Sequence, residues 1–454
     1  MDETSIGYNA YLISQNLFDE HGKHLPLYFE AFGEYKNPIY IYTTALLFKF
    51  TSGLGYIELL RLTSFLFWLI FFIGSYKVIQ VFSHSKFVLI LGLLVTAFSP
   101  FIFQISRISF EVISMASFMI WFYYFILRYD NLGKIKFLIF AASILGISYY
   151  SYSTARLFVI LAFLILFLYL LKKRATKSHL ILLVVIGAGL IVPAMTFSYV
   201  NDNALTRRFD SLTYINNPKL NLLEKSGKFL LNYFVNFDLS YLLIIGDRNS
   251  RHSTIYFGEI YVVMFVAVLL YFKHTKTLIS KPINAVLVGL FIVSPISTAL
   301  TNDTYHSLRG FIIFLTSLPF VFSGLEYIKD RKTIYALLIF TIIQIIGYLT
   351  YYFAPSGYQY QSRNATENYG FQPIINKLFE KEPQQIYLVN DYPDINRKFY
   401  EIVLDEKIEK VNPSTTFPTD SEICVISNKS FSHDKDFTYI ETVSNSDYRL
   451  WCNF

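Results

Sequence analysis

The sequence predicts an all-α polytopic membrane protein with about ten transmembrane helices, followed by a small α/β domain. Of its 454 residues, 54% are apolar, 19% are aromatic and only 16% are charged, which is unlike an ordinary soluble domain. Apolar runs near the roughly 20 residues that cross a bilayer recur along the chain. Short loops rich in lysine and arginine alternate with polar loops of another kind, which is the positive-inside pattern.

The apolar runs define the expected membrane spans. They cover residues 60–82, 87–106, 108–127, 136–150, 156–171, 180–200, 258–272, 283–299, 311–327 and 333–353. The basic loops, which we expect to face the cytoplasm, are 83–86, 128–136, 172–177, 273–281 and 329–332. An even number of spans then places both chain ends on the extracytoplasmic side of the cytoplasmic membrane.

The remaining segments give the expected domain organisation. Residues 1–59 are predicted to form a first external loop, with helices over 4–17 and 38–50 that lie in the membrane interface. Residues 60–353 form the transmembrane domain, whose long external loop, 201–255, is expected to hold an interfacial helix over 222–234. Residues 354–454 form an external α/β domain, with strands expected at 385–389, 423–426 and 437–440. A disulfide between Cys424 and Cys452 is compatible with that location, but the sequence leaves the pairing open.

Two external segments carry candidate groups at the start of helices. Asp2 and Glu3 would lie at the external mouth, where a carboxylate can accept the proton of an incoming hydroxyl, although acidic pairs beside an initiator methionine are common surface residues. His306 and Arg309 are three residues apart, so one helical turn directs both side chains into the same pocket.

Three further groups of cationic residues lie in external segments. Arg107 and Glu111 are four apart and can pair across a helix face, either as a structural ion pair or as part of a polar cavity. Arg248, Arg251 and His252 suit an anion, because arginine presents a rigid fork of donors to phosphate oxygens, with contact to lipid headgroups as the alternative. For Arg156 we expect headgroup contact first.

Other classes of function find little support. The sequence has no zinc-like spacing, no glycine-rich phosphate loop and no serine nucleophile elbow. The net charge of +6 resides mostly in the cytoplasmic loops, so it does not indicate a nucleic-acid partner. Polar groups restricted to the outside also argue against ATP as an energy source.

Several short sequence motifs in the external segments resemble, in their order along the chain, those of the C-type glycosyltransferases that use polyprenyl-phosphate sugars. The similarity is to the dolichyl-phosphate-mannose-protein mannosyltransferases and their bacterial relatives, including lipid A aminoarabinose transferases. The motifs are Asp2-Glu3, Tyr35-Lys36-Asn37-Pro38-Ile39-Tyr40, Ser106-Arg107 with Phe110-Glu111, Gly246-Asp247 with Arg251-His252-Ser253, Ser294-Pro295 with Leu300-Thr301, and His306-Ser307-Leu308-Arg309.

The resemblance implies a membrane enzyme that moves a sugar from a polyprenyl-phosphate donor to a hydroxyl of a protein, lipid or glycan acceptor outside the membrane, with inversion. Such an enzyme serves protein or cell-envelope glycosylation, requires no cofactor, and is compatible with a divalent cation. The catalytic base would be Asp2, with Glu3 beside it. The donor phosphate would be bound by Lys36, Arg107, Arg251 and His252, with His306 and Arg309 as weaker candidates.

The chain departs from that family's pattern in two respects. It starts without the helix that precedes the catalytic aspartate in relatives, so we expect a first family helix to be missing, and it has Asn37 where relatives often place a second proline.

A membrane transporter or flippase of a lipid-linked or glycan substrate is the main alternative. It predicts charged or helix-breaking residues near the middle of the membrane and repeated halves, whereas the ionisable groups here lie at the outer ends of spans. A polymerase or ligase using polyprenyl diphosphate, or a sensor with a ligand-binding C-terminal domain, also stays open.

Overall fold

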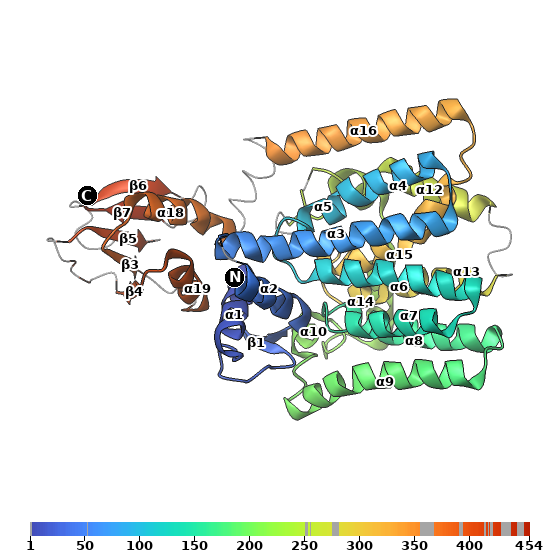
Figure 1. Cartoon of the computed structure of the whole chain (residues 1–454), viewed down its shortest axis with the longest axis horizontal. Helices are drawn as coiled ribbons and strands as arrows, with labels where there is room; N and C mark the ends of the chain where they lie inside the picture. Colours follow the sequence, from blue (N-terminus) through green and yellow to red (C-terminus); the bar gives the residue numbers. More distant parts are fainter. Residues whose placement is uncertain are drawn as a thin grey trace. The chain divides into compact units, whose positions relative to one another are not determined.

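The computed structural model describes residues 2–51, 53–249, 253–254, 256–274, 281–354, 367–389, 394–412, 415, 417, 421–427, 437–442 and 449–454. The chain divides into two compact units. We call Pro26–Tyr40 with Arg61–Leu349 the helical unit, and Met1–Leu25, Ile41–Leu60 and Thr350–Phe454 the terminal unit. Figure 1 shows long helices in the first and a small sheet in the second.

The predicted fold class is confirmed. Among the described residues, seven segments are long and apolar enough to cross a membrane: α3 (Tyr56–Phe82), α6 (Val112–Leu132), α8 (Ala155–Lys172), α9 (Lys177–Val200), α13 (Pro282–Val293) with α14 (Ile296–Ala299), α15 (Ser307–Leu325) and α16 (Arg331–Phe353). Three shorter apolar helices, α4 (Lys86–Phe98), α7 (Ile135–Ser148) and α12 (Val262–His274), lie at the positions of the other three predicted spans. The chain is a multi-pass membrane protein.

Helix α15 forms the centre of the helical unit. Its apolar window is 89% buried, compared with 17% for α9 and α16, and α4, α6, α12 and α13 all pack against it. Gly324 permits the closest approach, because a Cβ there would collide with the backbone carbonyl of Ala267 on α12. The first turn of α15 is therefore held on a rigid element.

Where the structure describes them, the predicted basic loops gather at one end of the helical unit. Side chains from different loops contact one another there: Ser83 donates to Glu326, Lys173 Nζ lies 2.8 Å from Asp130 Oδ1, the Tyr129 hydroxyl lies 2.7 Å from His179 Nδ1, and the rings of His274 and Tyr327 stack at 4.8 Å. The alternation of loops between two ends of the helices, predicted from charge alone, is thus present in the fold.

The terminal unit contains a five-stranded sheet in the order β4-β3-β5-β7-β6. Strands β3 (Gln385–Val389), β4 (Ile408–Val411) and β5 (Ile423–Ser427) are parallel, whereas β7 (Arg449–Cys452) and β6 (Thr438–Thr442) join antiparallel. Helices α18 (Glu367–Lys381) and α19 (Asp394–Leu404) contribute Ile374, Leu378 and Leu404 to its core. The three predicted strands are confirmed, and β4 and β7 are additional.

The predicted helices of the first segment are α1 (Asp2–Asn16) and α2 (Pro38–Phe50). Residues 3–7 of α1 are all buried, not only those on one face of the helix. Within the terminal unit, α1 packs on α19, and the ring of Phe399 leaves no room for a Cβ at Gly7. A hairpin of β1 (Phe29–Ala31) and β2 (Glu34–Lys36), which the sequence did not indicate, belongs to the helical unit.

The long loop after α9 holds α10 (Arg207–Leu212), α11 (Leu222–Val235) and the π-helix η1 (Tyr241–Ile245), and a further short helix, α5 (Pro100–Ile105), follows α4. Helix α11 begins with a capping box in which Asn221 and Glu224 each accept from the other's backbone N–H. Its Leu222 and Leu223 are more than 80% exposed, as an interfacial helix requires.

Cys424 and Cys452 form a disulfide between directly opposed residues of β5 and β7. The two cysteines are 28 residues apart, so the bond closes a loop that includes β6. Constraining such a loop in the unfolded chain stabilises the sheet by roughly 3 to 4 kcal/mol.

Replacing both cysteines by serine should therefore lower the stability of the terminal unit by about 3 kcal/mol. Trp451 on β7 supplies a fluorescence readout of denaturant unfolding, and reduced wild-type protein is the matched control. Equal midpoints for the oxidised, reduced and double-serine proteins would contradict this expectation.

Candidate functional site

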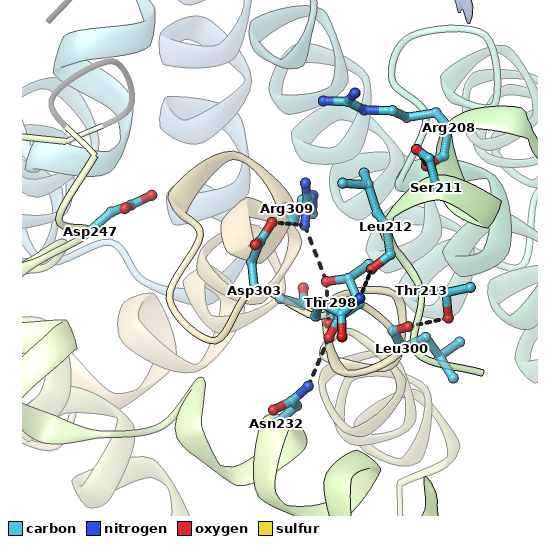
Figure 2. Close-up of polar contacts among 12 residues, drawn as sticks. Arg208, Ser211, Leu212, Thr213, Asn232, Asp247, Thr298, Leu300, Asp303 and Arg309 are labelled. Atoms are coloured by element: carbon cyan, nitrogen blue, oxygen red, sulfur yellow. Dashed lines mark hydrogen bonds and ion pairs between the residues drawn. The ribbon is translucent and has the colours of Figure 1, made fainter. Parts of the chain in front are cut away.

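The first turn of α15 places a buried cation at the end of the helical unit opposite the basic loops. Arg309 is 7% exposed, and its Nη1 donates to Asp303 Oδ2 at 2.6 Å and to Thr301 Oγ1 at 3.2 Å (Figure 2). The side chain of Asp303 is half exposed. The site is thus a desolvated guanidinium whose counter-ion faces outward.

The segment that holds the partners of Arg309 is itself fixed by hydrogen bonds from other loops. Figure 2 shows several of these bonds converging on residues 298–303. The donors and acceptors are Asn232 Nδ2 to Thr301 O at 2.8 Å, Asn302 N to Leu212 O at 2.9 Å, Thr213 Oγ1 to Leu300 O at 2.6 Å and Tyr214 Oη to Ala299 O at 2.9 Å. Arg309 is consequently preorganised rather than free to choose its partners.

Two buried acids hold the loop after η1 against the start of α15. Asp247 Oδ2 accepts from Ser307 N at 2.9 Å, next to the positive end of the helix dipole. Glu259 Oε1 accepts from Asp247 N at 3.0 Å and from the Ser307 hydroxyl. Burial raises the pKa of the Glu259 carboxyl to about 8, so this group is largely protonated near neutral pH. Gly246 takes a φ of 70° at the sharp turn into this network.

A second polar cluster joins three segments that are distant in sequence. Glu111 accepts from the Asn37 backbone N–H at 3.0 Å and from its side-chain amide at 2.6 Å. Arg156 donates to Asn37 Oδ1 at 2.8 Å and to Leu205 O at 2.7 Å, and its guanidinium lies 5.2 Å from the ring of Tyr28. Both terminal nitrogens of Arg156 therefore bind protein groups, and its contact with lipid headgroups stays a prediction.

The clusters lie at the same end of the helices. Ser297 on α14 donates to Thr154 O just before α8, while Tyr261 donates to Phe98 O. Helices α6, α8 and α15 each begin at this end and finish at the basic loops. The polar loops predicted to be external therefore do meet one another.

The predicted site residues divide between the two units. In the terminal unit, Asp2 begins α1, with its side chain outside the described residues, and Glu3 is buried. In the helical unit, His306 is the N-cap of α15 and shares its first turn with Arg309.

Lys36 is half-buried on β2, with its Nζ 6.0 Å from the ring of Phe32. Arg107 is exposed after α5, with its guanidinium 5.4 Å from the ring of Phe103. Arg251 and His252 lie outside the described residues. Convergence of all eight predicted residues on one substrate stays a prediction.

Sequence reasoning missed the two acids that organise the first turn of α15. Glu259 is a lone carboxyl in an apolar stretch just before α12. An isolated acid at the edge of a span indicates a buried polar network. Asp303 lies six residues before Arg309, where no helical spacing relates them. Among the described residues, no group of three or more His, Cys, Asp or Glu side chains could hold a metal ion.

Comparison with solved structures shows the fold. ArnT from Cupriavidus metallidurans bound to undecaprenyl phosphate matches with a TM-score of 0.59 at 9% identity, over 100% of this chain and 94% of that chain. The apo state of ArnT gives 0.55 at 10% identity, over 100% and 93%. The chain therefore shares the fold of ArnT over its whole length.

A weaker likeness extends to the oligosaccharyltransferase AglB from Archaeoglobus fulgidus in complex with an inhibitory peptide and a dolichol-phosphate. Its TM-score is 0.44 at 12% identity, over 94% of this chain and 65% of that chain, which is too low to carry an argument. No protein-family model and no curated protein sequence matches the chain.

Arg309 is buried whereas its partner Asp303 is half exposed, and this difference gives a test of the ion pair. Changing Asp303 to alanine leaves a buried guanidinium without its carboxylate and should cost about 1 to 3 kcal/mol of stability, whereas Asp303→Asn keeps an acceptor oxygen and should cost less. Glu34→Ala is the matched control, because it removes a more exposed pair with Arg208 at 3.1 Å and should cost under about 1 kcal/mol. Thermal unfolding in detergent measures all three, and equal losses for Asp303→Ala and Glu34→Ala would refute the burial argument.

Proposed function

We propose that this protein is a membrane glycosyltransferase that moves a sugar from a polyprenyl-phosphate donor to an acceptor hydroxyl on the extracytoplasmic side of the cytoplasmic membrane. The observation that carries the proposal is the full-length likeness to ArnT, whose structure binds undecaprenyl phosphate. Such a lipid keeps its phosphate at the membrane surface, and this chain gathers polar and cationic groups at one end of its spans.

The charges of that end suit a phosphate leaving group. Lys36 immediately precedes Asn37 of the second polar cluster, Arg107 lies in the turn between α5 and α6, four residues before Glu111, and Arg309 is fixed at the start of α15. A desolvated guanidinium binds phosphate oxygens through parallel donors and keeps its charge at any physiological pH. These residues, with Arg251, His252 and His306, would hold the donor phosphate.

The reaction then needs one base. As the acceptor oxygen attacks C1 of the sugar, Asp2 takes the hydroxyl proton, with Glu3 beside it. The bond between C1 and the phosphate oxygen breaks, and its electron pair leaves on the polyprenyl phosphate. The cationic side chains stabilise the charge that grows on that oxygen, and a single displacement inverts C1.

The sequence resemblance further favours the branch of dolichyl-phosphate-mannose-protein mannosyltransferases and their bacterial relatives. On that basis we propose a hexose or pentose donor and a role in protein or cell-envelope glycosylation. We also propose that the sheet domain is external, which its disulfide supports, since such bonds persist in oxidising compartments.

Release of polyprenyl phosphate tests the proposal. Wild-type protein in liposomes should cleave a labelled undecaprenyl-phosphate sugar when an acceptor is present, and Asp2→Asn should lower that rate by about 100-fold or more, because general-base catalysis contributes on that order. Asp202→Asn is the matched control: Asp202 is exposed and has a φ of 49°, which asparagine also tolerates.

Wild-type protein that releases no polyprenyl phosphate from any hexose or pentose donor, with protein, lipid and glycan acceptors supplied, would overturn the proposal. Movement of the intact lipid-linked sugar across the bilayer under those conditions would favour a flippase instead.

A further inference from the structure

A large cleft lies within the terminal unit. Its volume is about 1230 Å³, above the roughly 300 to 1,000 Å³ typical of sites for a drug-sized ligand. It is lined by α1, the end of α2, the first turn of α3, α18, and α19 with the turn that follows. A ligand of several rings fits a space of this size better than a single ring.

One side of the cleft is aromatic. The ring of Tyr56 meets Tyr11 edge-on at 5.4 Å and Phe48 edge-on at 5.1 Å. Tyr8 adds a further ring, with Lys398 Nζ 5.8 Å from its centroid, and Phe379 contributes a side chain that is 52% exposed. Rings of this kind present flat apolar faces, and tyrosine adds a hydroxyl that can donate or accept a hydrogen bond.

Carboxylates dominate the polar part of the lining. The acidic residues are Glu58, Glu401, Asp405 and Glu406, against the two lysines Lys398 and Lys407. Glu401 is fixed by Arg397 at 2.5 Å and by the Ile408 N–H at 2.9 Å, whereas the other three acids are exposed. Carboxylates accept hydrogen bonds from hydroxyl and ammonium groups, and they repel phosphate.

We propose that this cleft binds the acceptor as an oligosaccharide, through its neutral or amine-bearing sugar rings. This inference rests on the proposed transferase function and adds the substrate class, a glycan acceptor. Sugar rings match the lining because they combine an apolar C–H face, which stacks on tyrosine, with hydroxyls directed at carboxylates. The acidic balance of the lining disfavours a phosphorylated headgroup.

Binding can be measured without donor or turnover. Labelled full-length protein in detergent is applied to an array of neutral, amino and anionic oligosaccharides, and each oligosaccharide that binds is titrated by saturation-transfer NMR. We expect neutral or amino oligosaccharides to bind. We also expect Tyr56→Ala and Tyr11→Ala to weaken them at least ten-fold, and Asp405→Asn to weaken them more modestly.

Tyr439→Ala is the matched control, since Tyr439 is a half-exposed tyrosine on β6 outside the cleft. Retention of cooperative unfolding shows that each variant folds. The inference is overturned if the wild type binds no oligosaccharide on the array, if anionic glycans are preferred, or if Tyr56→Ala and Tyr439→Ala bind alike. It is also overturned if native mass spectrometry finds a phospholipid bound to the wild type and to Tyr439→Ala but not to Tyr56→Ala, because the cleft would then be a lipid site.

Failure of this inference can be told apart from failure of the transferase proposal. A protein that binds no glycan but releases polyprenyl phosphate overturns only the proposal for the cleft. Glycan binding that depends on Tyr56, in a protein that never cleaves a polyprenyl-phosphate sugar, overturns only the transferase.

Discussion

The exclusion of water from the bilayer core is the constraint on which this structure depends. Side chains between the ends of the spans must be largely apolar, so ionisable groups collect where helices begin and end. Helix α15 shows the result within one element. Arg309 is anchored in its first turn, its middle is packed on all sides, and Glu326 follows its last turn among the basic loops. Any chemistry on charged substrates is therefore confined to the ends.

The spans could be predicted because length and composition are properties of one segment at a time. The strands β3, β5 and β6 were found for the same reason, as short apolar runs between polar ones. The hairpin of β1 and β2 and the strands β4 and β7 have only three or four residues each, too few for a periodic pattern. The burial of α1 was missed because it depends on partners elsewhere in the chain.

The candidate site was predictable only in its residue types. Arg309 and His306 could be paired from their spacing along one helix. The bonds that fix the site join residues far apart in sequence: Asn37 with Glu111 at a separation of 74, and Ser307 with Glu259 at a separation of 48. Such partners follow from how helices pack, which a single sequence does not reveal. The acids Asp303 and Glu259 were missed for this reason, and with them the preorganisation of the first turn of α15.

The proposed chemistry requires the polar end of the helical unit to face the extracytoplasmic side. The accessibility of a single introduced cysteine at each end tests this most directly. Lys177 and Lys219 are both exposed and flank α9 and the loop after it, and Cys424 and Cys452 are blocked by their disulfide. In intact cells, a membrane-impermeant maleimide should label Lys219→Cys at once, and should label Lys177→Cys only after permeabilisation. The reverse pattern, with Lys177→Cys reactive from outside and Lys219→Cys protected, would place the polar end in the cytosol and contradict the proposed chemistry.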